Sequence, residues 1–213
     1  PGQFVNIAVP GDASSLLRVP LSYAAADAQA GTVEIWYAVV GDDTDRLSKM
    51  GPGSTSTLLG PGGHGWMVPA DVNRALLVAG GIGVPPILCL GRELSRRGIA
   101  FDVCLGAAEA DKVVGLDELK ALADTVVLCT DDGSAGIKGF CTEPAAKMLG
   151  EGAYGYVASC GPAIMMQKVA QAAAENDAYC EVSLERMMSC GFGACNTCNV
   201  ETVDGMKGAC MCG

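Results

Sequence analysis

Three closely spaced cysteines near the end of the chain have the pattern of iron–sulfur ligands. Cys190, Cys195 and Cys198 are spaced C-x₄-C-x₂-C, and a fourth cysteine, either Cys210 or Cys212, follows at a distance. This spacing is typical of plant-type 2Fe–2S clusters, which are held by cysteine thiolates. Two glycines between the first two cysteines would let the backbone turn its N–H groups toward the sulfur atoms. We therefore predict a 2Fe–2S cluster here. A structural zinc site is the alternative, although such sites usually contain two C-x₂-C pairs.

A second candidate site is a glycine turn that follows a predicted buried strand at residues 75–79. Gly80, Gly81 and Gly83 occupy the turn, and a predicted helix follows it. Backbone N–H groups at the start of a helix can bind the diphosphate of a dinucleotide when glycines allow it to approach. The turn is not a complete GxGxxG motif, so a glycine turn required only for packing is the alternative.

Cys160, Gly161 and Pro162 lie in an equivalent place, between another predicted strand and its helix. In open α/β folds, ligands bind at the carboxyl edge of the sheet, so we expect these residues to border the same site. Cys160 is the candidate catalytic residue. A buried free cysteine without a chemical role is the alternative.

The composition excludes several other kinds of site. The 213 residues include 24 acidic and 14 basic ones, which gives a net charge of −10, and a single histidine, His64, in a glycine-rich turn. Because no basic stripe is present, nucleic-acid binding is not expected. One histidine is too few for a Rieske centre or a two-histidine iron site. Catalysis would then depend on cysteines, backbone N–H groups or a bound cofactor.

The cysteines and the first residues also indicate a compartment. Several of the 11 cysteines are scattered singly, which fits a reducing environment better than a disulfide framework. The sequence opens with Pro-Gly-Gln-Phe rather than a basic stretch and an apolar run, and its most apolar segment, 75–91, is interrupted by glycines and prolines. We predict a soluble cytoplasmic protein that does not bind membranes.

The elements that must position these residues change in character along the chain. Residues 1–68 contain apolar, β-branched runs separated by Gly/Pro turns and no helical pattern, which predicts a small antiparallel barrel or sandwich. From residue 74 onward, strands alternate with helices, which predicts a parallel sheet covered on both faces. Beyond Met188 no regular periodicity is visible. Strands are expected at residues 3–9, 32–40, 55–59, 75–79, 101–106, 125–130, 154–159 and 178–184, and helices at 84–97, 116–122, 143–149 and 162–175.

In this order, the motifs resemble those of the ferredoxin-reductase family, and most closely those of the electron-transfer subunits of dihydroorotate dehydrogenase B. The similarity covers essentially the whole chain, and its most specific part runs from Ser183 to Cys195. The resemblance implies a ferredoxin-reductase-like fold. A partial antiparallel β-barrel at 1–68 would bind FAD, a Rossmann-like α/β domain at 69–184 would bind NAD, and a C-terminal Cys-rich segment at 185–213 would bind the cluster. It also implies further barrel strands before residue 1 and further residues after residue 213.

The resemblance also implies which residues bind the flavin. On the family's motifs these positions are Val19, Pro20, Leu21, Ser22, Trp36, Tyr37, Ala38, Asp43 and Thr44. Three departures change the charge of the expected site. Val19 stands where the family has an arginine, with Arg18 one residue earlier. Ala38 stands at the arginine of the family's aromatic-Arg pair, and Asp43 stands where the family has a glycine.

For the fourth cluster ligand, the resemblance selects Cys210. The family pattern is Cys, one variable residue, an acidic residue and Gly-Pro, and it places Cys212 at the acidic position. In an extended segment the two side chains would point the same way, about 6.5 Å apart. A hairpin turn at Asp204-Gly205 would bring the chain back to the other cysteines, and Cys212 lies too close to the chain end to be a good anchor.

The implied function is electron transfer in pyrimidine biosynthesis. A partner subunit containing FMN would oxidise dihydroorotate, and electrons would pass through the cluster and FAD to NAD⁺ within a heterotetramer. NAD is expected rather than NADP, because Glu109 and Asp111 follow the strand at 101–106 and no arginine does. The alternatives are a subunit of the anaerobic sulfite reductase or ferredoxin–NADP oxidoreductase type, or a non-catalytic module stabilised by zinc. The ferredoxin–NADP type typically has an aspartate where this chain has Cys190.

Overall fold

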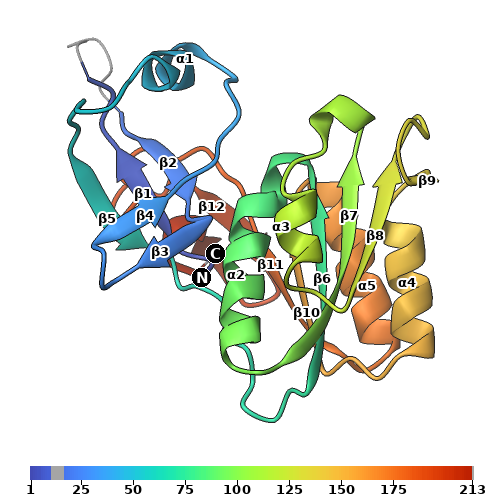
Figure 1. The fold of residues 1–213 in the computed structure, drawn as a ribbon. Helices are drawn as coiled ribbons and strands as arrows, with labels where there is room; N and C mark the ends of the chain where they lie inside the picture. The colour runs from blue at the N-terminus through green and yellow to red at the C-terminus, as the bar shows by residue number, and fades with distance from the viewer. Residues whose placement is uncertain (11–16, 213) are drawn as a thin grey trace.

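Two sheets of opposite character lie side by side in the computed structural model, which describes residues 1–10 and 17–212 (Figure 1). An antiparallel sheet of three strands is formed by the N-terminal part of the chain. A parallel sheet of six strands is formed by the middle part. The sequence predicted this change of pattern from residue 74 onward, and the first strand of the parallel sheet begins at Arg74.

The antiparallel sheet has the strand order β2-β1-β5, and a separate hairpin, β3–β4, lies beside it. A short helix, α1, follows the hairpin. The bounds are β1 (Phe4–Ile7), β2 (Val19–Ser22), β3 (Ala25–Asp27), β4 (Thr32–Glu34), α1 (Asp42–Ser48) and β5 (Leu58–Gly62).

This part differs from the sequence prediction at three places. The strand expected at 32–40 ends at Glu34, and residues 36–38 border a cavity instead of pairing with a strand. The strand expected at 55–59 is displaced to 58–62. Helix α1 was not predicted. Its acidic first turn suits a helix start, and the Thr44 hydroxyl accepts hydrogen bonds from the N–H groups of Val40 and Gly41 just before the helix.

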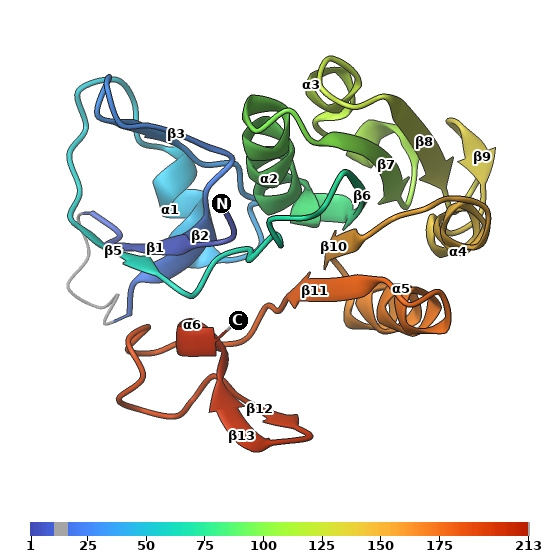
Figure 2. The same cartoon turned by 90° about the horizontal axis from the view of Figure 1, so that it is seen from below.

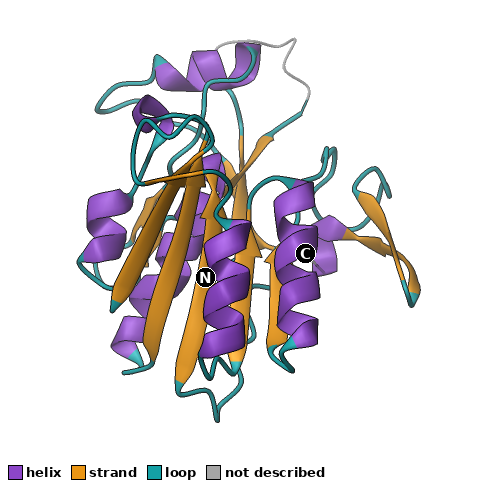
Figure 3. Cartoon of the chain, turned by 90° about the vertical axis from the view of Figure 1, so that its right-hand side faces the viewer, coloured by secondary structure: helices purple, strands orange, loops and turns teal. Residues whose placement is uncertain are grey.

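The parallel sheet has the order β11-β10-β6-β7-β8-β9, with α2 and α3 on one face and α4 and α5 on the other (Figures 2 and 3). The bounds are β6 (Arg74–Gly80), η1 (Gly81–Gly83), α2 (Val84–Arg96), β7 (Ala100–Ala107), η2 (Ala110–Lys112), α3 (Leu116–Lys120), β8 (Thr125–Thr130), β9 (Ile137–Lys138), α4 (Thr142–Glu151), β10 (Tyr156–Cys160), α5 (Ala163–Glu175) and β11 (Tyr179–Ser183).

The central strand β6 shows why this sheet is covered on both faces. Leu77 packs into the core under α2 and α3, and its neighbours Leu76 and Val78 pack into the core under α4 and α5. All three side chains are fully buried. Because successive strand residues point to opposite faces, a continuous apolar run requires a layer of helices on each side.

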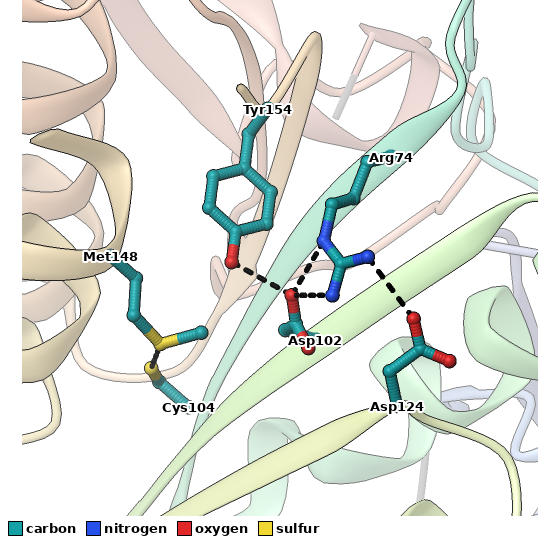
Figure 4. Close-up of polar contacts among 6 residues, drawn as sticks. All are labelled: Arg74, Asp102, Cys104, Asp124, Met148 and Tyr154. Atoms are coloured by element: carbon teal, nitrogen blue, oxygen red, sulfur yellow. Dashed lines mark hydrogen bonds and ion pairs between the residues drawn. The ribbon is translucent and has the colours of Figure 1, made fainter. Parts of the chain in front are cut away.

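A polar cluster joins the strands at the amino edge of the parallel sheet (Figure 4). The buried carboxylate of Asp102 accepts hydrogen bonds from Nε and Nη2 of Arg74 at 2.9 and 2.6 Å and from the Tyr154 hydroxyl at 2.7 Å, all on Oδ2. Arg74 also reaches Asp124, at the start of β8. The cluster lies at the edge opposite to the glycine turns.

The C-terminal segment folds back onto the antiparallel sheet. It contains the hairpin β12 (Asn199–Thr202) and β13 (Gly205–Gly208), followed by the short helix α6 (Ala209–Cys212). The hairpin projects at the bottom of the view in Figure 2. Phe4 of β1 packs against Cys198, Ala209 and Cys210. Regular structure was not predicted beyond Met188, apart from the hairpin turn, which is present.

In the two described stretches of the chain, no helix has both the length and the apolar character needed to cross a bilayer.

Candidate functional site

A cavity of about 330 Å³ lies where the antiparallel sheet, the parallel sheet and the C-terminal segment meet. Eight of the nine residues predicted to bind flavin line it, together with the candidate catalytic Cys160. The exception is Asp43, which lines an adjoining open hollow of about 750 Å³. The eight are Val19, Pro20, Leu21, Ser22, Trp36, Tyr37, Ala38 and Thr44.

Strand β2 supplies one wall of this cavity because it pairs with β1 in antiparallel register, Ser22 opposite Phe4. Val19 contributes an apolar surface. Its neighbour Arg18 donates a hydrogen bond from Nη1 to the carbonyl of Thr57 at 2.6 Å and thereby ties β2 to the segment before β5. The guanidinium of Arg18 is therefore engaged outside the cavity that Val19 lines.

The glycines of the turn at the end of β6 are of two kinds: some are required by packing, and one leaves open space for a ligand. A Cβ on Gly83 would lie 2.3 Å from the Cys160 carbonyl oxygen, and one on Gly80 would lie 2.7 Å from a side chain of α5. At Gly83 the approach of the backbone alone requires glycine, and at Gly80 the packed side chains at the start of α5 would have to shift. Gly81 has a φ of +54° and open space around its missing Cβ. Gly161, with φ +149°, packs against the Gly80 carbonyl from the other strand. The packing alternative thus explains three of the four glycines, and Gly81 is the one that faces open space.

Cys160 ends β10 at the carboxyl edge of the sheet, opposite Ser183 of β11 in the parallel register. Its side chain is 2 % exposed and lines the cavity. Burial raises the pKa of this thiol to about 12, and the negative charge of Glu185 acts in the same direction. The thiol is therefore protonated at neutral pH, so it can contact a ligand but is not an activated nucleophile. Pro162, the next residue but one, caps α5.

The four cysteines predicted to bind iron are arranged as two pairs. Hydrogen bonds from Thr197 and from Cys190 lower the pKa of the Cys195 thiol to about 6. Burial and the nearby Cys198 thiol raise the pKa of Cys210 to about 11. Cys195 therefore interacts with Cys190, whereas Cys210 interacts mainly with Cys198 and also with Cys190.

Backbone N–H groups point at one sulfur of each pair. Ala194 N–H donates to Cys190 Sγ at 3.3 Å, and Cys210 N–H donates to Cys198 Sγ at 3.4 Å. The glycines on either side of Phe192 make the first turn possible, with φ values of +74° and +84°. Among the described residues, no three His, Cys, Asp or Glu side chains converge on a position for one metal ion. Cysteine thiols that accept hydrogen bonds from backbone N–H groups are the ligand chemistry that an iron–sulfur cluster uses.

Cys212 lies apart from these pairs. Because 209–212 form a helical turn, the extended geometry expected for Cys210 and Cys212 is wrong, and residues two apart on a helix point in different directions. Cys210 is buried, whereas Cys212 is exposed and lines a separate small cavity beside His64 and Glu181.

Several residues of the cavity were not found from the sequence. The most informative are Glu185 and Arg186, which follow β11, and Ala209, which precedes Cys210. Arg186 is the one cation among the described residues lining the cavity, and it also lines the adjoining hollow. A signal was available, because segments that follow the carboxyl ends of parallel strands border the ligand site in open α/β folds.

Comparison with known proteins finds relatives that are similar to this chain in sequence. The chain is 39% identical over 202 residues to a dihydroorotate dehydrogenase B (NAD⁺) electron-transfer subunit from Fusobacterium nucleatum, covering 93% of this chain and 76% of the relative. It is 34% identical over 212 residues to a probable subunit of the same kind from Methanocaldococcus jannaschii, covering 100% of this chain and 76% of that one. No protein-family model matches the chain.

Solved structures give the same result at the level of the fold. A structure of an NADH-dependent reduced ferredoxin–NADP oxidoreductase is 32% identical, with a TM-score of 0.85 over 100% of this chain and 76% of that one. The ferredoxin reductase of a carbazole 1,9a-dioxygenase is 19% identical, with a TM-score of 0.68, covers 85% of this chain and 59% of that one, and shares the fold alone. The predicted ferredoxin-reductase-like fold is confirmed.

Proposed function

The chain belongs to the family of dihydroorotate dehydrogenase B (NAD⁺) electron-transfer subunits. We propose that it accepts electrons from a partner flavoprotein, which oxidises dihydroorotate, and passes these electrons to NAD⁺. The observation that carries this proposal is the cavity itself. It brings together the positions expected for flavin, the cysteine at the nucleotide edge and a residue adjacent to a cluster cysteine. When bound, FAD supplies hydride exchange with NAD⁺, and a 2Fe–2S cluster supplies single-electron transfer.

We propose that the flavin occupies the cavity between β2 and the segment 36–38. Val19 and Leu21 offer apolar contacts, Ser22 offers a hydroxyl, and Tyr37 offers a half-buried ring. Pro20, Trp36, Ala38 and Thr44 complete the wall, and Asp43 borders the hollow next to it. The division into 1–68, 69–184 and 185–213 follows from the same assignment.

The nicotinamide nucleotide is proposed to bind at the carboxyl edge of the parallel sheet. Gly81 leaves room for a diphosphate to approach backbone N–H groups at the start of α2, while Gly80 and Gly83 shape the turn. Cys160 presents a neutral thiol toward the cavity, with Gly161 and Pro162 behind it. This thiol excludes water and positions the ring, and it does not act as a nucleophile.

Cys190, Cys195, Cys198 and Cys210 are proposed to hold the 2Fe–2S cluster, one thiol pair for each iron. The backbone donors at Ala194 and at Cys210 itself would stabilise thiolate sulfur. Exposed Cys195 places one side of this site at the surface, where a redox partner can approach. The partner is proposed to be the FMN-containing catalytic subunit, assembled with this chain as a heterotetramer in the cytoplasm.

The proposal is tested by co-expressing the full-length protein with its candidate flavoprotein partner and purifying the complex without oxygen. We expect a reddish-brown protein with two irons, two sulfides and one FAD per chain, which reduces NAD⁺ when dihydroorotate is added. A colourless chain containing zinc and no flavin would contradict the proposal and favour the zinc-stabilised module.

A further inference from the structure

A chain of polar contacts connects the indole of Trp36 to helix α2. Trp36 donates a hydrogen bond from Nε1 to Glu34 Oε1 at 2.7 Å. The other oxygen of this carboxylate accepts a hydrogen bond from Nη1 of Arg92 at 3.2 Å. The same Arg92 nitrogen donates to the carbonyl of the fully buried Ala24 at 3.0 Å. The hairpin β3–β4 and its aromatic side chain are thus tied to the helix that begins at the glycine turn.

The Trp36 ring reaches the opposite domain at the amino ends of two helices. A Cβ on Gly115, which precedes α3, would lie 3.2 Å from Cζ3 of the Trp36 ring and 2.7 Å from Val84, the first residue of α2. The half-buried ring packs on the core cluster beneath α2 and α3. It also lines the flavin cavity. Trp36 is therefore a shared wall between that cavity and the end of α2 that carries the nucleotide turn.

The position of Trp36 depends on Glu34, which contacts both the indole and Arg92 of helix α2. Glu34 binds the indole N–H with one oxygen and Arg92 with the other, so the carboxylate fixes the ring relative to α2. The ion pair is partly exposed, with side-chain exposures of 35% for Arg92 and 47% for Glu34, so its effect on overall stability is small. The effect of the pair is therefore sought in the position of the Trp36 ring, which Glu34 contacts directly.

We propose, on the basis of the proposed function, that Glu34 and Arg92 form a positioning pair that holds Trp36 in place and thereby sets how a nicotinamide nucleotide engages beside the flavin. The pair can affect flavin binding only through Trp36, because neither Glu34 nor Arg92 lines the cavity and seven other expected flavin positions there are untouched. Loss of the pair frees the ring to move and widens the distribution of distances between the two binding surfaces. The larger cost falls on nucleotide binding.

The test compares Glu34→Ala, Arg92→Gln and Arg92→Lys in the FAD-loaded complex. A matched control is Arg96→Gln, which breaks an exposed ion pair with Glu93 on the same helix without touching the hairpin. NADH oxidation with ferricyanide as acceptor, two ferricyanides reduced per NADH, gives KM and kcat. We expect KM for NADH to rise about tenfold in Glu34→Ala and Arg92→Gln. A tenfold rise corresponds to a loss of about 1.4 kcal/mol of binding free energy. Arg92→Lys keeps the charge and should recover most of the loss, and Arg96→Gln should not change KM.

Flavin affinity and indole fluorescence separate this role from a merely structural one. FAD affinity should change much less than KM for NADH in all variants, because Trp36 is one of eight expected flavin positions in the cavity wall and the other seven are untouched. In a Trp66→Phe background, the fluorescence emission of Trp36 should shift to longer wavelength in Glu34→Ala, because the released ring becomes more exposed to water. Unchanged KM with normal FAD binding would overturn the inference, and so would loss of FAD in parallel with the rise in KM. If the unmodified chain binds no FAD, the proposed function itself fails.

Discussion

Cys210 donates its backbone N–H to the thiol sulfur of Cys198 across 3.4 Å, although the two residues are 12 positions apart in the chain. The hairpin β12–β13 between them produces this contact, since it returns the chain to the place where it left. Both side chains are buried against Phe4 of the antiparallel sheet. The second half of the proposed cluster site is therefore preformed by the fold.

The first prediction distinguishes the two cysteines of α6. Cys210→Ser should abolish or strongly perturb the visible absorption of the cluster, because a buried thiol beside Cys198 is replaced by a weaker ligand. Cys212→Ser should leave the spectrum unchanged, because that side chain lines another cavity. Absorption and iron content of the two variants check this. The reverse result would show that the ligand assignment is wrong.

The second prediction concerns Arg186, the cation that lines the proposed flavin cavity. Arg186→Ala should weaken FAD binding about tenfold, because a charge-assisted contact to a phosphate is lost in a site that also contains Glu185. Riboflavin, which lacks phosphate, should bind equally to both proteins. Titrations followed by flavin fluorescence measure these affinities, with Arg97→Ala as a control on an exposed arginine at the end of α2. Equal FAD affinities in Arg186→Ala and the unmodified protein would exclude this contact.

The third prediction is a preference for NADH over NADPH. Glu109 and Asp111 are exposed in the loop after β7, and Asp132 is held nearby by Ser134, whose hydroxyl accepts the N–H of Ala110. A ribose hydroxyl suits this acidic loop, whereas a 2′-phosphate would be repelled. We expect kcat/KM to be at least tenfold higher with NADH. Steady-state assays with both nucleotides decide the matter, and a preference for NADPH would refute it.

The fourth prediction concerns stability. Asp102→Asn should lower the free energy of unfolding by about 2–3 kcal/mol, since the buried carboxylate organises Arg74 and Tyr154. The value is below that of a fully buried pair because the Arg74 side chain is 38% exposed. Urea unfolding measures the change. Glu151→Gln, in an exposed pair with Lys147, should cost less than about 0.5 kcal/mol, and cluster and flavin contents should not change.

The fifth prediction is a loss of stability at alkaline pH. Burial raises the pKa of the Cys141 and Cys160 thiols to about 12 and that of Cys180 to about 11, from a value of 9.0. Below pH 9 these thiols are protonated in both the folded and the unfolded chain, so the free energy of unfolding keeps its full value. Between pH 9 and 12 the unfolded chain releases protons that the folded chain retains, and each such thiol lowers the unfolding free energy by up to about 1.4 kcal/mol per pH unit.

Urea unfolding of the apoprotein from pH 8 to pH 10.5 tests this. Cys141→Ala should show a shallower decline than the unmodified protein, because one raised pKa is removed. A stability that does not change over this range would contradict the assignment of these thiols as buried and neutral.

The α/β part of the fold could be predicted from the sequence, because its signals are local. The run at 75–79 is apolar at every position, and the strand at 125–130 begins and ends at the predicted residues. Helix α1 was missed because Leu47 is the one apolar residue in its seven positions that becomes buried, which leaves no amphipathic pattern to detect. The strand at 32–40 was overestimated because β-branched and aromatic residues favour a strand only where a partner pairs with them.

The cavity shows a different limit. Its wall at 19–22 and 36–38 was expected from family motifs, whose positions are local in sequence. Arg186 closely follows β11 and was missed although segments after the carboxyl ends of parallel strands border such sites. Ala209 was not expected because it reaches the cavity only when the C-terminal segment folds back over β1, and such a contact between distant segments leaves no motif around Ala209.

Ala209 lies between the cavity and Cys210, the proposed fourth cluster ligand. It lines the proposed flavin cavity, and Cys210 is the next residue in the chain. Consecutive Cα atoms are about 3.8 Å apart, so a flavin in the cavity and a cluster on Cys210 would be separated here by about one residue. Electron transfer slows as the separation between donor and acceptor grows. A larger residue at position 209, such as leucine, would therefore be expected to slow electron transfer without removing any ligand.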